Sequence, residues 1–183
     1  MAHMHYDAVV VGAGQGGGPL ATAFARAGRR TALIERAHVG GTCINEGCTP
    51  TKTMIASARV AYLARRAGDY GVETESVSVD MRAVRERKRA IVTSFRESSE
   101  KRIEETPGLD LLRGEACFAD PKSLLVAMPD GERKITTDLI VLDVGTRPAP
   151  PPLPGLERIP ALDSTSVMEL AEAFNNLFAN LRD

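Results

Sequence analysis

Cysteine and histidine are both scarce in this sequence, with three residues of each among 183. Three cysteines cannot form the disulfide framework of a small secreted domain, so any bridge between them is expected to be redox-active. His38 is the last histidine in the chain, and His3 and His5 stand in its first five residues. No histidine is therefore well placed to act as a general base.

The sequence also lacks long apolar runs and an excess of charge. No stretch approaches the roughly eighteen apolar residues that a membrane span needs, and no charged leader with an apolar core opens the chain. The net charge of −1 gives no electrostatic reason to expect nucleic acid or an anionic membrane as a partner. We expect a cytoplasmic globular protein, with the basic run 82–89 on a solvated helix face.

The first thirty-five residues have the pattern of a β-α-β unit. A β-branched run over 7–11 predicts a buried strand, 20–27 predicts a helix that Gly28 ends, and 31–35 predicts a second strand that ends in a carboxylate. A parallel sheet is built from such units. The predicted fold class is α/β, a Rossmann-like domain with a parallel sheet.

The rest of the chain predicts two helices, a small β-meander and a tail. The helices are expected over 49–66 and 81–105, and the strands over 109–118, 123–128, 134–137 and 139–144. The predicted organisation is a leader over 1–5, one domain over 6–147, a proline-rich linker over 148–162, and a C-terminal amphipathic helix over 163–183.

The tail has a helix-start signature and one apolar face. Ser166 followed by Glu169 fits a capping box, and apolar residues then recur at helical spacing from Val167 to Leu181. Such a face needs a partner, either this domain or another chain. A homo-oligomer formed through this helix is one of the two expectations.

A glycine-rich turn separates the first strand from the first helix. Gly12-Ala13-Gly14-Gln15-Gly16-Gly17 satisfies the G-x-G-x-x-G pattern, in which the glycines permit a tight turn, close approach to a pyrophosphate and close helix-strand packing. The helix N-terminus favours phosphate. Glu35, at the end of the next strand, is placed to accept both ribose hydroxyls of an adenosine half.

Cys43 and Cys48 lie five positions apart, shortly after this turn. On an ideal helix their Cα atoms would be about 8.6 Å apart. A disulfide needs about 7 Å or less, so a bridge would exclude regular helix between them. Two buried free cysteines or half of a metal site are the alternatives. No other Cys or His pair has ligand spacing, so no metal is expected, and Cys117 is interpreted as a core thiol.

The segment 40–52, Gly-Gly-Thr-Cys-Ile-Asn-Glu-Gly-Cys-Thr-Pro-Thr-Lys, resembles the redox-disulfide signature of one enzyme family. That family is the class I pyridine nucleotide-disulfide oxidoreductases, the flavoproteins that include dihydrolipoamide dehydrogenase, glutathione reductase and mercuric reductase. Together with the glycine turn and Glu35, the resemblance covers most of 6–154. It implies an FAD-binding domain with a redox disulfide over 6–147, in an enzyme that works as a dimer.

The resemblance also implies a role for each matching residue. Cys43 would be the interchange thiol that reacts with a disulfide, thiol or metal-ion substrate, Cys48 the thiol against the flavin, and Lys52 a neighbour of its reactive edge. The residues that the resemblance implies in FAD binding are Gly12, Gly14, Gly16, Gly17, Glu35, Gly41, Thr42, Ala116 and Gly145.

Four features depart from the family. A second G-x-G-x-x-G for NAD(P)H is absent, so that cofactor is expected only in a full-length parent, and no histidine follows His38 to supply the family's His-Glu dyad. Asp143-Val144-Gly145 stands where the family usually has Ala-Thr-Gly, and a buried Asp143 must be hydrogen-bonded or protonated. The tail resembles the family's C-terminal interface helix, which predicts an internal deletion near 167–170.

Three functions are consistent with these residues. The first is the FAD and redox-disulfide part of a disulfide oxidoreductase, incomplete without the NAD(P)H and interface domains. The second is a non-catalytic FAD-binding or apo scaffold module that associates through its C-terminal helix. The third, an NAD-binding Rossmann protein with incidental cysteines, requires that Cys43 and Cys48 be unable to bridge.

Overall fold

The computed structural model describes residues 3–170, which divide into two compact units. Of these residues, 3–45 and 94–146 make up the first unit, and 46–93 and 147–170 make up the second. The predicted domain boundaries at 147 and 162 stay predictions.

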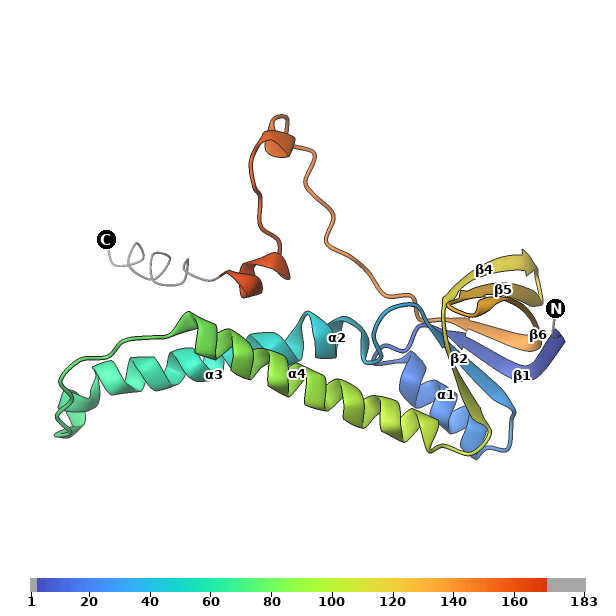
Figure 1. Ribbon diagram of the computed structural model, residues 1–183, viewed down its shortest axis with the longest axis horizontal. Coiled ribbons are helices and arrows are strands. Elements are labelled where there is room, and N and C mark those ends of the chain that lie inside the picture. The colour runs from blue at the N-terminus through green and yellow to red at the C-terminus, as the bar shows by residue number, and fades with distance from the viewer. Residues whose placement is uncertain (1–2, 171–183) are drawn as a thin grey trace. The chain divides into compact units, whose positions relative to one another are not determined.

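The first unit holds the whole sheet (Figure 1). Its elements are β1 (His3–Val11), α1 (Gly17–Arg26), β2 (Thr31–Glu35), α2 (Gly41–Asn45), β3 (Leu109–Arg113), β4 (Glu115–Asp120), β5 (Ser123–Met128) and β6 (Gly131–Leu142). The helix α4 (Met81–Glu104) begins in the second unit and ends in the first. The strand β1 starts at His3, so three residues of the expected leader take part in the sheet.

The sheet has six strands in the order β3-β2-β1-β6-β5-β4. The pairs β3-β2, β2-β1 and β1-β6 are parallel, whereas β6-β5 and β5-β4 are antiparallel. The predicted α/β class, with its parallel β-α-β unit and β-meander, is confirmed. The two strands expected over 134–137 and 139–144 are one continuous strand, β6.

Gly114 divides the single strand that the sequence predicted over 109–118. The strands β3 and β4 stand at the two ends of the sheet order, yet only Gly114 separates them in the chain. The sheet must therefore curve until its two ends meet at this residue. A Cβ on Gly114 would lie 2.4 Å from the carbonyl oxygen of Ala127, so only glycine permits the crossing.

The two faces of the curved sheet bury two separate cores. Alternate strand residues point to opposite faces, and Val9 accordingly packs in one cluster while Val10 packs in the other. The inner cluster includes Tyr6, Ile34 and Leu124 from the strands alone. The outer cluster joins the strands to α1 and to Ile103 of α4. The helices thus cover one face, and the curvature of the sheet itself covers the other.

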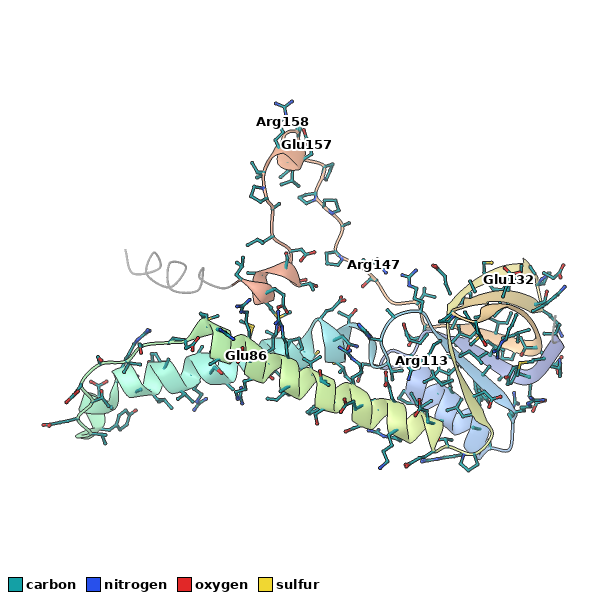
Figure 2. All side chains as sticks on the ribbon, in the orientation of Figure 1. Glu86, Arg113, Glu132, Arg147, Glu157 and Arg158 are labelled. Carbon is teal, nitrogen blue, oxygen red and sulfur yellow. The ribbon has the colours of Figure 1, made fainter. Side chains whose placement is uncertain are left out.

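Two side-chain contacts hold β3 in place. The fully buried Tyr6 of β1 donates its hydroxyl to Asp110 Oδ2 on β3 at 2.8 Å. Arg113, near the end of β3, pairs with Glu100 and Glu104 of α4, both at 3.2 Å (Figure 2). β3 is an edge strand, so these contacts supplement a ladder that pairs on one side only.

The second unit contains a helical hairpin and short 3-10 turns. It consists of α3 (Cys48–Arg65), η1 (Ala67–Tyr70), the first part of α4, η2 (Leu156–Arg158) and η3 (Ser166–Glu169). The helices α3 and α4 were predicted almost to the residue, and Asp80 caps α4 by accepting from the N–H groups of Arg82 and Ala83. Met54, Met81 and Met168 form the small apolar cluster of the second unit.

The predicted capping box at Ser166 is wrong. Asp163 caps η3, because its Oδ1 accepts from the N–H groups of Thr165 and Ser166. Glu169 instead pairs with Lys88 and Arg89 of α4, 81 and 80 positions away. The residues 171–183, with most of the predicted C-terminal helix, lie outside the described residues.

The basic run 82–89 is exposed at Arg82, Arg87 and Arg89, as a solvated helix face predicts, but Lys88 departs from that expectation. Lys88 is only 3% exposed, and its ammonium donates to the carbonyl oxygen of Met168 at 3.0 Å and to Glu169. Arg87 donates to the Thr53 carbonyl of α3. Burial alone raises the pKa of Glu169, but the hydrogen bonds from Lys88 and Arg89 outweigh it and lower that pKa below its ordinary value.

Between His3 and Leu170, the helices do not combine the length and the apolar character that crossing a membrane would require.

We expect Tyr6→Phe to lower the free energy of unfolding by about 1 kcal/mol, because Asp110 loses its donor. Burial, and then the hydrogen bond and charge of Asp110, raise the pKa of Tyr6 above its ordinary value. Because folding favours the protonated phenol, this contribution is present below the ordinary pKa and is lost as the pH rises towards the raised one. Urea denaturation near neutral pH and at about pH 11 measures both effects.

The matched control is Tyr70→Phe, since Tyr70 is 71% exposed. It should change the unfolding free energy by less than about 0.5 kcal/mol. Equal effects at Tyr6 and Tyr70, or an alkaline loss of stability that Tyr6→Phe does not reduce, would contradict the assignment.

We expect Glu169→Ala to destabilise the second unit by about 1–3 kcal/mol, because it leaves the buried Lys88 ammonium with the Met168 carbonyl alone. Adding Lys88→Met to that variant should recover part of the loss, since an apolar side chain of similar volume needs no counter-charge. Thermal denaturation followed by circular dichroism measures both variants.

Glu86→Ala is the control, because exposed Glu86 pairs with exposed Arg82 on the same helix (Figure 2). Its effect should stay below about 0.5 kcal/mol. A double variant less stable than Glu169→Ala would show that the ammonium is not the source of the cost.

Candidate functional site

The glycine turn between β1 and α1 is held by close backbone contacts. Gly12 has φ +103°, and a Cβ on it would lie 2.1 Å from the main-chain oxygen of Asp143. A Cβ on Gly17 would lie 2.0 Å from the carbonyl oxygen of Gly12. The turn therefore requires glycine at both positions, and it brings the N-terminus of α1 against the end of β1.

Glu35 reaches back from the end of β2 to this turn. Its Oε2 accepts from the N–H of Ala13 at 2.9 Å, and its Oε1 accepts from the N–H of Ala37 at 2.8 Å. Each carboxylate oxygen has a second lone pair. The geometry fixes the carboxylate beside the turn and leaves it able to accept further hydrogen bonds, as ribose recognition requires.

The segment that begins the cysteine signature starts on the same turn. Gly40 donates its N–H to the carbonyl oxygen of Ala13 at 2.7 Å and accepts from Gln15 Nε2 at 3.3 Å. A Cβ on Gly41 would lie 2.9 Å from Gly14 Cα. The structure thus brings the glycine turn, Glu35 and the start of the signature together within the first unit.

Asn45 and Arg96 fix this segment from its other end. Asn45 donates its amide to the carbonyl oxygens of Val39 at 3.0 Å and Gly41 at 2.9 Å. Arg96 Nε of α4 donates to Asn45 Oδ1 at 2.8 Å. Sequence reasoning did not identify Arg96, because it lies 51 positions from its partner and belongs to no motif.

The cysteines lie on two successive helices. Cys43 is half-buried on α2, whereas Cys48 is an exposed free thiol at the first residue of α3. Glu46 and Gly47 separate the helices, and Gly47 has φ −129° and ψ −104°. The chain between the cysteines is therefore not regular helix, as a bridge requires. The bridge itself, and the roles of Cys43, Cys48 and Lys52, stay predictions.

The other predicted binding residues have varied environments. Exposed Thr42 follows Gly41, half-buried Ala116 of β4 packs against the inner core, and exposed Gly145 has φ +66°. Cys117 is exposed on the edge strand β4, so the expectation of a core thiol is wrong. Across residues 3–170, His, Cys, Asp and Glu side chains form no group of three that could hold a metal ion.

Asp143 is the residue at this turn whose position the motif did not predict. It follows the last residue of β6, and its Oδ2 accepts from the N–H of Gly17 at 2.6 Å. Gly16, the N-cap of α1, has no side chain to cap the helix, so Asp143 supplies the carboxylate. The sequence-based requirement that Asp143 be hydrogen-bonded or protonated is met by this bond.

The profile of the family described as pyridine nucleotide-disulphide oxidoreductase matches residues 6–178 of this chain. A mercuric reductase of Staphylococcus aureus is 34% identical over 167 residues, which are 91% of this chain and 30% of that protein. A probable pyridine nucleotide-disulfide oxidoreductase of Escherichia coli, RclA, is 35% identical over 170 residues, 91% of this chain and 35% of that protein.

Solved structures agree with the sequence matches. The structure of the HOCl-induced flavoprotein disulfide reductase RclA from Escherichia coli superposes with a TM-score of 0.73 at 34% identity, covering 91% of this chain and 34% of that one. The chain thus spans about a third of the length of the proteins that it matches.

We expect Gly17→Ala to destabilise the first unit by more than about 2 kcal/mol, because its Cβ would overlap the carbonyl oxygen of Gly12 and neither backbone segment can yield. Gly18→Ala is the matched control one residue later in α1. A Cβ on Gly18 meets nothing within 4 Å, so this change should raise stability by up to about 1 kcal/mol through helix propensity. Urea denaturation of both variants tests the turn, and equal effects would contradict it.

Proposed function

The chain belongs to the pyridine nucleotide-disulphide oxidoreductase family, and from that premise we propose that it binds FAD on the glycine turn and exchanges electrons with a Cys43–Cys48 disulfide. The observation that carries the proposal is the contact between the turn and the signature segment. Gly40 and Gly41 pack on Ala13 and Gly14, so the residues leading into Cys43 start beside the expected pyrophosphate position.

The turn and Glu35 fit the FAD that the family implies. The glycines place no side chain of their own between the backbone and a pyrophosphate, and Glu35 has lone pairs for the ribose hydroxyls. Asp143 does not fit, because its carboxylate already accepts from Gly17. This misfit favours a second candidate function, an apo scaffold that retains the fold and has lost the cofactor.

Bound FAD, once reduced by NAD(P)H in a longer protein, would supply the electron pair that the disulfide needs. In our proposal the Cys43–Cys48 bond takes two electrons and two protons and gives two thiols. Cys43 then serves as the interchange thiol that attacks the substrate, and Cys48 as the thiol against the flavin. Cys48 stands in the first turn of α3, where helix N–H groups favour an anion, and the thiolate is the reactive form.

The substrate class follows from the chemistry of a dithiol. A reactive thiol pair can reduce a disulfide or bind a soft metal ion, and the names of the relatives include a mercuric reductase and a flavoprotein disulfide reductase. We propose a disulfide, thiol or metal-ion substrate, with NAD(P)H as electron donor in a longer protein. Association with a second copy through the tail stays part of this proposal.

The test is the absorbance spectrum of the protein purified with FAD, before and after dithiothreitol under anaerobic conditions. We expect a flavin band, and a long-wavelength shoulder after reduction that reports a thiolate lying against the flavin. Cys43→Ser should show this shoulder without any reductant, because Cys48 remains unbridged. Cys48→Ser should not show it under either condition.

Cys117→Ser is the control, because Cys117 is an exposed thiol on β4, outside the signature. It should behave as the unmodified protein does. A protein that stays colourless after incubation with FAD would exclude the redox function and leave the scaffold. A flavin band with no shoulder in Cys43→Ser would retain FAD binding and exclude the assigned role of Cys48.

A further inference from the structure

The carboxylate of Asp143 occupies the space above the glycine turn. Its oxygens lie 3.1, 3.3 and 2.9 Å from the points where a Cβ would stand on Gly14, Gly16 and Gly17. It also accepts from the Gly17 N–H at 2.6 Å. One side chain thus fills the volume over three glycines and accepts a hydrogen bond from an N–H group at the N-terminus of α1.

These are the features that a dinucleotide pyrophosphate needs at such a turn. The absence of side chains lets the phosphates approach the backbone, and the N–H groups at the helix start neutralise their charge. A carboxylate in the same place excludes the phosphates by its volume, competes for the Gly17 N–H, and repels them as a like charge.

We infer that Asp143 is an internal anion that competes with the pyrophosphate of FAD and lowers the affinity of this chain for it. The inference rests on the proposed function, since it concerns the same site. FAD can enter only after the Asp143 side chain has rotated away from the turn. The affinity measured for the unmodified protein therefore includes the cost of displacing it.

The main chain at Asp143 is held in place, so rotation of the side chain is the available movement. The N–H of Asp143 donates to the carbonyl oxygen of Val11 at 2.8 Å, and its own carbonyl packs against Gly12. The side chain is half-buried, with its attachment to the turn through Gly17. A change of χ1 releases that hydrogen bond without disturbing β6.

A purely structural role for Asp143 predicts the opposite result. If the carboxylate served only to cap α1, its removal would loosen the turn and weaken any ligand bound there. If it also blocks the anion position, its removal destabilises the free protein and strengthens FAD binding. Only in the second case does removal of the carboxylate lower the stability of the free protein and raise its affinity for FAD.

The experiment is a titration of the full chain with FAD, followed by flavin fluorescence, for the unmodified protein, Asp143→Ala and Asp143→Asn. Asp143→Ala should lower the Kd for FAD at least about tenfold, because it removes the charge, the volume and the competing acceptor. Asp143→Asn keeps an oxygen acceptor for Gly17 and removes only the charge, so we expect a smaller gain of about threefold. ADP, which also carries a pyrophosphate, should show the same order as a competitor.

Asp138→Ala is the matched control, because it removes the same charge from β6 at an exposed position. Its Kd should stay within about twofold of the unmodified value. Thermal denaturation supplies the second readout. Without FAD, Asp143→Ala should melt roughly 2–4 °C lower through loss of the cap, and saturating FAD should raise its melting temperature more than that of the unmodified protein.

The outcomes separate this inference from the proposed function. If the unmodified protein binds FAD and Asp143→Ala binds it no more tightly, the inference is wrong and the proposed function stands. If the unmodified protein binds FAD too weakly to measure and Asp143→Ala binds it, both are supported. If neither the unmodified protein nor either Asp143 variant binds FAD, both are overturned, and a cooperative melting transition of Asp143→Asn, which keeps the cap, shows that the loss is not a failure to fold.

Discussion

The backbone contact between Gly12 and the end of β6 governs the geometry of the first unit. Gly12 has a positive φ and lies so close to the Asp143 main chain that no side chain can be added. This approach sets where β1 ends, how α1 leaves the sheet, and which residue of the β6 exit faces the turn. Glu35, Gly40 and Gly41 then hydrogen-bond or pack around the same few atoms. The geometry of the turn is thus a consequence of main-chain packing more than of any individual side chain.

The local part of this architecture could be predicted from the sequence. The β-α-β unit and the two long helices follow from periodicity and from glycine and cap positions, which act within a few residues. The predictions that failed depend on partners far along the chain. The buried Lys88 donates hydrogen bonds to Glu169 and to the Met168 carbonyl. Ser166 does not cap η3, because Asp163 accepts from the N–H groups at its start.

Strand assignment failed for a related reason. A run such as 109–118 has strand character throughout, and composition does not show that Gly114 sends its two halves to opposite ends of the sheet. Cys117 then falls on an edge, where an apolar sequence context does not imply burial. At the site, the departure from the family at Asp143 could be recognised in the sequence. Its contact with Gly17 could not, because the two residues lie 126 positions apart.

The register of the sheet also sets an order of assembly. β1 pairs with β6 along eight positions, from His3 opposite Lys134 to Val11 opposite Leu142, so among the described residues the first strand in the chain pairs with the last. Contacts of such large sequence separation form slowly, and until they form one edge of β1 is bare. During synthesis the glycine turn and α1 emerge from the ribosome more than a hundred residues before Asp143. Until Asp143 has been made, the N–H groups at the start of α1 therefore lack the carboxylate that later accepts from Gly17, and they are open to the solvent.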